Sequence, residues 1–377
     1  KTGFDFTKLP FEGAGPIAEP KNVILIFMEG ISARTLSHYG GQYSDLMPNL
    51  DKFAKHTITV DRYYNHTAAT YRGTRGSLTS AFPLEGGASA WEARLDGAKE
   101  GRSLIKYSSL PSILTARGFE TRFYSAHSKP NVYNSFVADI GFTEIISADD
   151  MATVGRSKRS AEWASDQELF TKMAQDLKER ELSGEDAPFF WSSYNMGSHA
   201  FVDVEDDGLK YGDGENPALN RFHNLDHRIS IFINAFEASK FAKDTLLIIT
   251  SDHSSYAEPP MANAFSSGAK YTPHFIDRIP FLIKHPRGVK PFRFENGIRT
   301  SLDLAPTVLH LMNISDVKNS FLGTTIFDTS VTPTENWAAL GHAFYRIDES
   351  GVTQLSSEIA TTSDTNARDS ILYNFEI

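Results

Sequence analysis

Continuous apolar runs recur along this chain, and each of them ends abruptly in polar residues. They lie in residues 21–30 (KNVILIFMEG), 187–201 (APFFWSSYNMGSHAF), 245–255 (TLLIITSDHSS) and 278–286 (RIPFLIKHP). Such runs are typical of strands that are buried on both faces, as in a parallel sheet covered by helices. We therefore expect these segments to lie inside one sheet.

Amphipathic segments separate the apolar runs. Apolar residues recur at helical spacing in residues 160–181, 217–239 and 301–314, and Pro48 can begin a further helix. In the first of these segments Trp163 is expected on the core-facing side of the helix. The alternation of strands and helices predicts an α/β fold, with a central, mostly parallel sheet flanked by helices on both faces.

Three parts of the chain differ in pattern. Residues 1–20, rich in Gly and Pro, are expected to form an irregular lead-in, and residues 21–330 the main α/β domain. Short segments typical of strands follow within residues 337–377, so residues 331–377 are expected to form a small C-terminal antiparallel sheet packed on the main domain. We find no internal repeat and no linker that would divide the chain.

Charge and composition exclude several classes. The net charge of −10 argues against nucleic acid as a partner, because binding to a phosphate backbone needs a basic face. With 0 Cys the chain has no disulfides, no thiolate metal ligands and no Cys nucleophile. No apolar run reaches the roughly 18 residues of a membrane span. Because the first residue is Lys1 rather than Met, we expect a membrane anchor upstream of this fragment.

Acidic residues and a histidine follow two of the expected strands. Glu29, followed by Gly30, ends the first apolar run, and Asp252 and His253 end the run at 245–255. In open α/β sheets the carboxyl ends of the strands form the crevice in which ligands bind. Taken alone, Asp252 and His253 could equally be a capping Asp and a surface His, but the arrival of Glu29 at the same edge favours a metal site.

A second informative stretch, HTAATYRGTRGSLTSAFP at residues 66–83, is rich in hydroxyl groups and glycine. A small-residue loop that opens into a helix presents backbone N–H groups and the positive end of the helix dipole to an anion. Thr74, between Gly73 and Arg75, would place a hydroxyl near that end. The alternative interpretation is a Ser/Thr-rich helix cap.

These side chains together suit metal-assisted group transfer. One divalent ion, Mn²⁺, Mg²⁺ or Zn²⁺, would accept three oxygens and one nitrogen from Glu29, Thr74, Asp252 and His253. A Thr hydroxyl is a poor nucleophile, but metal coordination favours its alkoxide and draws charge from a phosphoryl or sulfuryl oxygen under attack. We therefore predict a covalent phospho-threonine on Thr74, with Thr70 or Ser77 as the alternative nucleophile.

Further polar side chains are candidate substrate contacts, with ordinary loop or surface polarity as the alternative for each. They are Arg72 and Arg75 for charge stabilisation, His199 and His274 as proton donors to a leaving alcohol, and Lys129 and Asn131 in a loop that follows a strand.

Seven segments in this order resemble the sulfatase-like branch of the alkaline phosphatase superfamily. They are NVILIFMEG, PNLDKFA, the Thr74 loop, MGSH at 196–199, TSDH at 250–253, RIPFLIKHP and SLDLAPTVLHLMNI. Within that branch the chain is most similar to lipoteichoic acid synthase and related phosphoglycerol transferases, with the phosphoethanolamine transferases as near relatives.

The resemblance implies a site and a setting. Glu29, Thr74, Asp252 and His253 would bind one divalent metal ion, with Mn²⁺ the first expectation, Thr74 would be the nucleophile, and His199 would contact substrate. The chain would be the extracytoplasmic catalytic domain of a bacterial cytoplasmic-membrane protein. It would transfer a headgroup from phosphatidylglycerol or phosphatidylethanolamine to a glycan or lipid acceptor of the cell envelope.

Other functions stay open at this stage. Phosphoethanolamine transferases are typically rich in disulfides, so the absence of Cys favours phosphoglycerol transfer. A sulfatase would need Cys or Ser in a signature that contains Pro, and TRGSLTS has neither Cys nor that Pro. A two-metal phosphodiesterase would need further Asp and His ligands. A non-catalytic lipid-binding domain would have no reason to keep all four metal ligands.

Overall fold

The computed structural model describes residues 19–83, 108–151, 163–204, 208–265, 275–286, 292–295, 297–328, 330, 332–356 and 360–376. The expected lead-in lies almost entirely outside these ranges, and so does the candidate site residue His274.

A central sheet runs through the described part of the chain in the order β5-β4-β6-β1-β7-β8-β2-β9. Its strands are β1 (Asn22–Met28), β2 (Ile58–Val60), β4 (Glu120–Ser125), β5 (Glu144–Ile146), β6 (Phe189–Tyr194), β7 (Thr245–Ser251), β8 (Phe281–Lys284) and β9 (Phe292–Phe294). The strands from β5 to β7 are parallel, whereas β8 runs antiparallel to both β7 and β2. The prediction of a central, mostly parallel sheet is confirmed.

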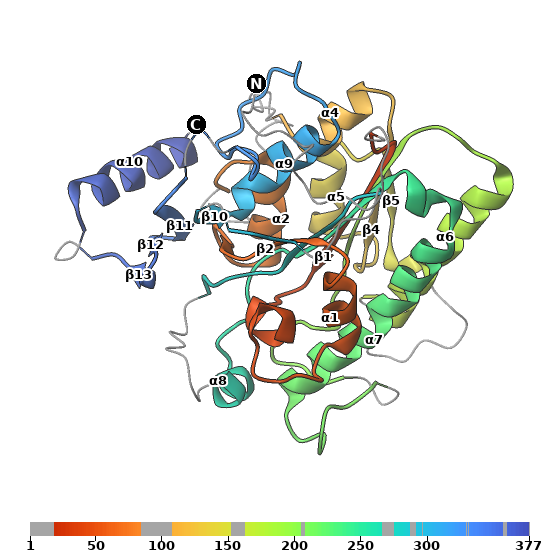
Figure 1. Cartoon of the computed structure of the whole chain (residues 1–377), viewed down its shortest axis with the longest axis horizontal. Helices are drawn as coiled ribbons and strands as arrows, with labels where there is room; N and C mark the ends of the chain where they lie inside the picture. Colours follow the sequence, from red (N-terminus) through yellow and green to blue (C-terminus); the bar gives the residue numbers. More distant parts are fainter. Residues whose placement is uncertain are drawn as a thin grey trace.

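Side chains of β1 alternate between two hydrophobic cores. Ile24 and Met28 join the core on one face of the sheet, and Val23 and Phe27 join the core on the other. The first core is covered by α1 (Pro48–Ala54), α6 (Asp166–Ser183), α7 (Pro217–Ala238) and α8 (Pro259–Phe265) (Figure 1). The second is covered by α2 (Thr70–Thr79), α4 (Leu110–Ala116), α5 (Val132–Asp139) and α9 (Leu304–Leu311). Helices on both faces, as predicted, leave the strand ends as the place where polar residues gather.

Short 3₁₀ turns connect several of these elements. They are η2 (Ala33–Thr35), η3 (Ser37–Tyr39), η4 (Ala148–Asp150), η6 (Lys240–Lys243) and η7 (Ser301–Asp303). Within the described residues, no helix has the length and apolar character that crossing a membrane requires.

Two expected elements begin or divide differently. The helix expected at 160–181 is α6, which begins at Asp166 because Ser165 and Glu168 form a capping box there. Trp163 therefore precedes the helix instead of packing on its core face. Residues 57–66, whose apolar alternation also predicts one strand, are divided between β2 and β3 (Tyr63–Tyr64), and β3 pairs with β10 (Arg299–Thr300) in a separate small sheet.

The C-terminal part combines a sheet with a helix. β11 (Asn336–Leu340), β12 (Ala343–Asp348) and β13 (Gly351–Gln354) form the predicted antiparallel sheet. The last segment, at residues 371–377, was also expected as a strand, and this is wrong, because residues 371–376 belong to α10 (Thr362–Glu376). Thr361 and Asp364 exchange hydrogen bonds as a helix cap, and Ile371 packs against Ala339 and Phe344 of the small sheet.

Asp364 connects α10 to this small sheet, so its removal should loosen the C-terminal part alone. Its carboxylate accepts hydrogen bonds from Trp337 Nε1 at 3.1 Å and Arg346 Nη1 at 2.8 Å. We expect Asp364→Ala to destabilise the small sheet by about 1–3 kcal/mol. Hydrogen exchange should increase across β11–β13 and stay unchanged in β1. Asp369→Ala, on the exposed side of the same helix, is the control, and equal effects of both variants would contradict this role.

Candidate active site

The ends of β1 and β7 lie side by side, with Met28 opposite Ser251. Glu29 and Asp252, the residues directly after these strands, are therefore neighbours at the carboxyl edge of the sheet. Ser251 Oγ donates to the Met28 carbonyl at 2.6 Å, and the Gly30 N–H donates to Asp252 Oδ1 at 3.0 Å. These bonds hold the two strand ends in one fixed arrangement.

Glu29, Asp252 and His253 each direct one possible ligand atom into the same small space. His253 Nε2 lies 3.3 Å from Glu29 Oε1 and 3.6 Å from Asp252 Oδ2, and all three residues are 0% exposed. Within the described residues, none of these three atoms has a hydrogen-bond partner. A buried polar atom without a partner costs about 1–3 kcal/mol, and a charged one costs more. A bound cation would satisfy all three atoms together.

The three side chains shift one another's pKa values. Burial alone would raise the pKa of Glu29, but the neighbouring His253 outweighs burial and lowers it. Burial and the Glu29 carboxylate both raise the pKa of Asp252. Burial alone would lower the pKa of His253, but Asp252 and Glu29 raise it to about 9. Without a bound cation, the raised pKa of His253 favours a protonated imidazole beside the Glu29 carboxylate.

The ring of His253 is also fixed in orientation. Its Nδ1 donates to the Ser254 carbonyl at 2.7 Å, which leaves Nε2 facing the two carboxylates. A histidine that ligates a metal commonly donates its other ring nitrogen to a carbonyl in this way. Two carboxylate oxygens and one imidazole nitrogen fit a single divalent ion, and this donor set accepts Mn²⁺, Mg²⁺ and Zn²⁺ alike.

Helix α2 approaches this group closely because it carries a glycine at the contact. A Cβ added to Gly73 would lie 2.1 Å from the Asp252 carbonyl oxygen, so no larger residue fits without displacing the helix. Ala69, just before the helix, has a φ of 67°, in the left-handed region that non-glycine residues rarely adopt. This backbone conformation turns the chain so that α2 begins at Thr70, beside Glu29.

Thr70 is the hydroxyl that reaches the acidic group. Its Oγ1 donates to Glu29 Oε2 at 2.7 Å, and the residue is partly exposed. Thr74 was expected near the start of the helix, which is wrong, because the helix begins one turn earlier. Thr74 is 0% exposed and accepts a hydrogen bond from the Tyr133 hydroxyl at 3.1 Å. Its assignment as metal ligand and nucleophile stays a prediction, and Thr70 is the better placed of the two.

The spacing of small residues could have indicated this position. Thr70, Gly73 and Gly76 recur every third residue, which puts them near one another on one side of a helix. Gly76 packs against the buried ring of His66 as Gly73 packs against Asp252. The side of the helix that carries small residues therefore faces the protein interior, and its first member is Thr70.

The turn at residues 195–198 holds Glu29 from the other side. Asn195 Oδ1 accepts from the Glu29 N–H at 2.9 Å, and Ser198 Oγ donates to the Glu29 carbonyl at 2.7 Å. Of the residues in this region, only His199 was expected to contact substrate. Asn195 and Ser198 could have been identified from the sequence, because they flank Gly197 directly after an apolar strand.

His199 lies close to the acidic group, at the partly exposed end of this turn. Its ring is 6.2 Å from that of Tyr256, and the Tyr256 ring is 5.2 Å from that of His253, measured between centroids. His199 also contributes to the lowered pKa of Glu29. The structure thus brings His199 near the three possible metal ligands, and its contact with substrate stays a prediction.

The other candidate contacts are placed less directly. Lys129 Nζ pairs with Asp150 Oδ2 at 3.0 Å, and Asn131 Oδ1 caps α5 by accepting from the Tyr133 N–H at 2.8 Å. A substrate contact by either residue stays a prediction.

The two arginines of α2 differ in exposure. Arg75 is 3% exposed and lies inside the protein, whereas Arg72 is partly exposed on the first turn of the helix. Of the two, Arg72 is the one that a ligand at the start of α2 could approach.

Comparisons with known proteins agree with this arrangement. Residues 21–314 match the sequence model of the sulfatase family. A protein of the alkaline phosphatase superfamily from Vibrio parahaemolyticus has a TM-score of 0.73 and 18% identity, covering 98% of this chain and 88% of that one. The lipoteichoic acid synthase LtaP from Listeria monocytogenes has a TM-score of 0.73 and 17% identity, with 100% and 94% covered. The C-terminal periplasmic domain of EcEptC from Escherichia coli has a TM-score of 0.57 and 14% identity, with 95% and 97% covered. At these identities the three structures show a shared fold.

The close approach of α2 makes a prediction about stability. We expect Gly73→Ala to lower the free energy of unfolding by about 1–3 kcal/mol, because the added methyl group overlaps the Asp252 carbonyl. Urea unfolding would measure this change. Ser77→Ala, which adds no atoms to the same helix, is the control and should stay close to the unaltered protein. An unchanged unfolding midpoint for Gly73→Ala would mean that the helix does not pack this closely.

The charge coupling makes a prediction about pH. A cation must displace the proton from His253, whose pKa is raised to about 9, so lower pH weakens metal binding. We expect the apparent affinity for Mn²⁺ to rise about tenfold per pH unit from about pH 7 to pH 9 and then level off. Calorimetric titration at a series of pH values would measure this dependence.

Glu29→Gln and Asp252→Asn should both abolish binding, and stoichiometric Mn²⁺ in both variants would rule out this ligand set.

Proposed function

This chain belongs to the sulfatase family, within the alkaline phosphatase superfamily, and we propose that it transfers a phosphoglycerol headgroup from a membrane phospholipid to a glycan or lipid acceptor of the cell envelope. One observation carries the proposal. The Thr70 hydroxyl, at the start of a helix, donates to a carboxylate of a buried group that suits a divalent ion. A nucleophile, a metal site and the positive end of a helix thus meet at one place.

The identity of the residue at position 70 favours phosphoryl transfer over sulfate ester hydrolysis. A sulfatase that uses formylglycine makes this group from Cys or Ser, and Thr70 is neither. A threonine hydroxyl can instead form a phosphate ester, which a second alcohol then takes over. The two carboxylates and the imidazole of this group are all present, which argues against a non-catalytic lipid-binding domain.

In the first step, Thr70 Oγ1 attacks the phosphorus atom of the donor. The P–Oγ1 bond forms while the bond between phosphorus and the diacylglycerol oxygen breaks. The Thr70 proton faces Glu29 Oε2, which accepts its hydrogen bond and is therefore the first place to which the proton can move. We propose that His199, whose ring lies beside that of Tyr256, protonates the leaving oxygen.

The surroundings favour charge on the phosphoryl group. A phosphate ester on Thr70 would lie at the N-terminus of α2, where the helix dipole favours negative charge. A divalent ion held by Glu29, Asp252 and His253 would favour the deprotonated hydroxyl and withdraw charge from the phosphoryl oxygens. Mn²⁺ is our first expectation for this ion.

In the second step, a hydroxyl of the acceptor attacks the same phosphorus atom. The new P–O bond forms, the P–Oγ1 bond breaks, and a proton returns to Thr70 Oγ1. We propose that the donor is phosphatidylglycerol and that the domain works at the extracytoplasmic face of a bacterial cytoplasmic membrane. If the headgroup differs, the reaction would be transfer of phosphoethanolamine. If water is the acceptor, the reaction would be hydrolysis of a phosphodiester or a sulfate ester.

Intact mass after incubation with Mn²⁺ and phosphatidylglycerol tests this function. We expect a glycerophosphate adduct that peptide mapping assigns to Thr70. Thr70→Ala should remove the adduct and lower turnover by about 10⁴-fold or more, because the nucleophile is lost. Thr74→Val should retain the adduct and lose less than about tenfold, since that hydroxyl contacts Tyr133 instead of the acidic group.

The other outcomes of this measurement are equally informative. An adduct on Thr74 would overturn the assignment of Thr70 and restore the sequence-based prediction. A phosphoethanolamine adduct with phosphatidylethanolamine would change the headgroup and keep the mechanism. No adduct with either lipid, together with hydrolysis of aryl sulfates or aryl phosphodiesters, would make the protein a hydrolase.

A further inference from the structure

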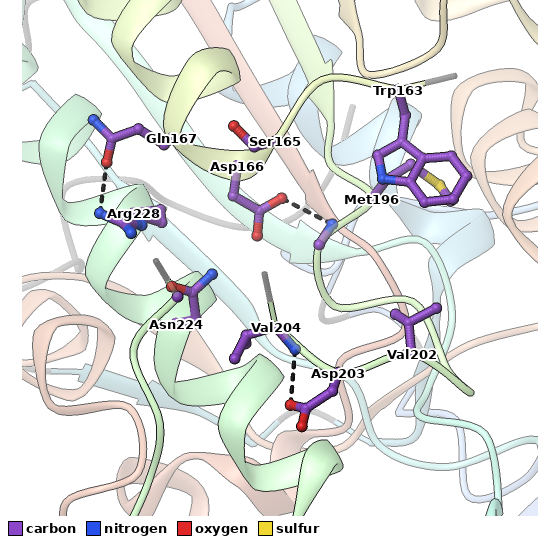
Figure 2. A pocket seen from close by; sticks show the side chains of 12 residues that line it. Trp163, Ser165, Asp166, Gln167, Met196, Val202, Asp203, Val204, Asn224 and Arg228 are labelled. Atoms are coloured by element: carbon purple, nitrogen blue, oxygen red, sulfur yellow. Dashed lines mark hydrogen bonds between the residues drawn. The ribbon is translucent and has the colours of Figure 1, made fainter. Parts of the chain in front are cut away.

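A partly enclosed pocket lies beside the candidate active site, between α6, α7 and the turn at residues 195–198. Its residues are Trp163, Ser165, Asp166, Gln167, Met196, Gly197, Val202, Asp203, Val204, Gly208, Asn224 and Arg228 (Figure 2). Its volume is about 50 Å³. At roughly 10–15 Å³ for each water-sized group, this volume admits about four such groups. A pocket of this size suits a small polar group, such as the hydroxymethyl end of a sugar or part of a glycerol unit.

The lining of the pocket is mixed in character. Figure 2 shows Trp163 and Met196 on one side and Gln167 with Arg228 on the other. Arg228 Nη1 donates to Gln167 Oε1 at 2.7 Å, which fixes both side chains as part of the wall. The carboxylate of Asp166 lies between these two sides. The pocket therefore offers an apolar surface on one side and both hydrogen-bond donors and acceptors on the other.

The charges of the lining disfavour anions and metal ions. Asp166 and Asp203 outnumber the single guanidinium of Arg228, which disfavours a phosphate or another anion. The guanidinium in turn disfavours a metal ion in the same space. A neutral group with several hydroxyls fits this lining, because each hydroxyl both donates and accepts a hydrogen bond and the C–H face of the group can pack against the indole of Trp163.

The pocket and the candidate active site share one wall. Asn195 and Ser198 bind the backbone of Glu29 on one side of the turn, and the residues between them, Met196 and Gly197, line the pocket on the other. The Gly197 N–H donates to Asp166 Oδ1 at 2.9 Å. A Cβ added to Gly197 would lie 2.5 Å from that carboxylate, so no larger residue fits at position 197 unless Asp166 shifts.

From this placement we infer that the pocket is an acceptor subsite, which binds a neutral, hydroxyl-rich group of the molecule that receives the phosphoryl group. The inference rests on the proposed transfer function. An acceptor that is anchored there and extends past the turn toward Thr70 would present its reacting hydroxyl at a high effective concentration. That hydroxyl forms a bond to phosphorus, the P–Oγ1 bond breaks, and the acceptor's proton ends on Thr70 Oγ1. An acceptor held in this way would compete with water for the phosphoryl group.

The partition of the headgroup between transfer and hydrolysis tests this role. The unaltered protein would be incubated with Mn²⁺, headgroup-labelled phosphatidylglycerol and methyl α-glucoside or glycerol as the acceptor. We expect Trp163→Ala and Gln167→Ala to lower the ratio of transfer to hydrolysis about tenfold, because they remove one side of the pocket each. Consumption of the donor should stay within about twofold, because neither residue contacts Thr70 or the acidic group.

Two further variants make the test specific. Trp163→Phe keeps an aromatic face and should retain most of the ratio. Asn234→Ala lies on the exposed side of α7, outside the pocket, and should behave like the unaltered protein. An unchanged ratio in Trp163→Ala and Gln167→Ala, with the donor consumed normally, would overturn the subsite and leave the proposed function in place.

A binding measurement separates the two proposals. Saturation-transfer NMR should detect methyl α-glucoside on the unaltered protein and lose the signal in Trp163→Ala. Absence of that signal from the unaltered protein would overturn the subsite. If the donor is not consumed at all, the proposed transfer fails and the acceptor role fails with it, whereas a binding signal that depends on Trp163 would still establish a polyol site.

Discussion

The parallel pairing of β1 with β7 is the constraint on which the rest of this site depends. The register that puts Met28 opposite Ser251 forces two carboxylates and an imidazole into one buried space. Burying such a group without a cation is unfavourable, so the cost must be met by the packing of the surrounding sheet. Apolar side chains on both faces of β1 and β7 provide that packing. The stability of the core and the chemistry of the site are thus coupled through two strands.

Helix α2 adds the nucleophile to this arrangement through a close contact. Gly73 allows the helix to touch the Asp252 backbone, and the left-handed Ala69 sets where the helix begins. Together they place Thr70 against Glu29. On the opposite side, Asn195 and Ser198 fix the backbone of the same carboxylate, and their turn separates it from the pocket. One acidic residue is therefore held by three segments that lie far apart in the sequence.

Much of this architecture could be predicted from the chain alone. The apolar runs indicated the central strands, and the polar residues at their ends indicated Glu29, Asp252 and His253, because strands that are buried on both faces leave only their ends for chemistry. Boundaries were harder to predict. Thr74 was expected near the start of a helix, but α2 begins one turn earlier, after Ala69, which provides no side-chain cap that a sequence pattern could reveal. The segment at 371–376 was expected as a strand and lies in α10, whose cap by Thr361 and Asp364 forms only in the folded backbone.

Local pattern and composition were enough to predict the class of fold, the kind of residues at the strand ends and the absence of thiol chemistry. These features follow from local pattern and composition, which do not depend on how distant segments meet. The folded structure was needed to see that Thr70, and not Thr74, faces Glu29, and that Trp163 lines a pocket instead of packing in the core. Helix rotation, close approach at Gly73 and the shared wall at residues 195–198 depend on contacts between distant segments. No local sequence pattern predicts such contacts, because the same residues could form a helix or a loop without them.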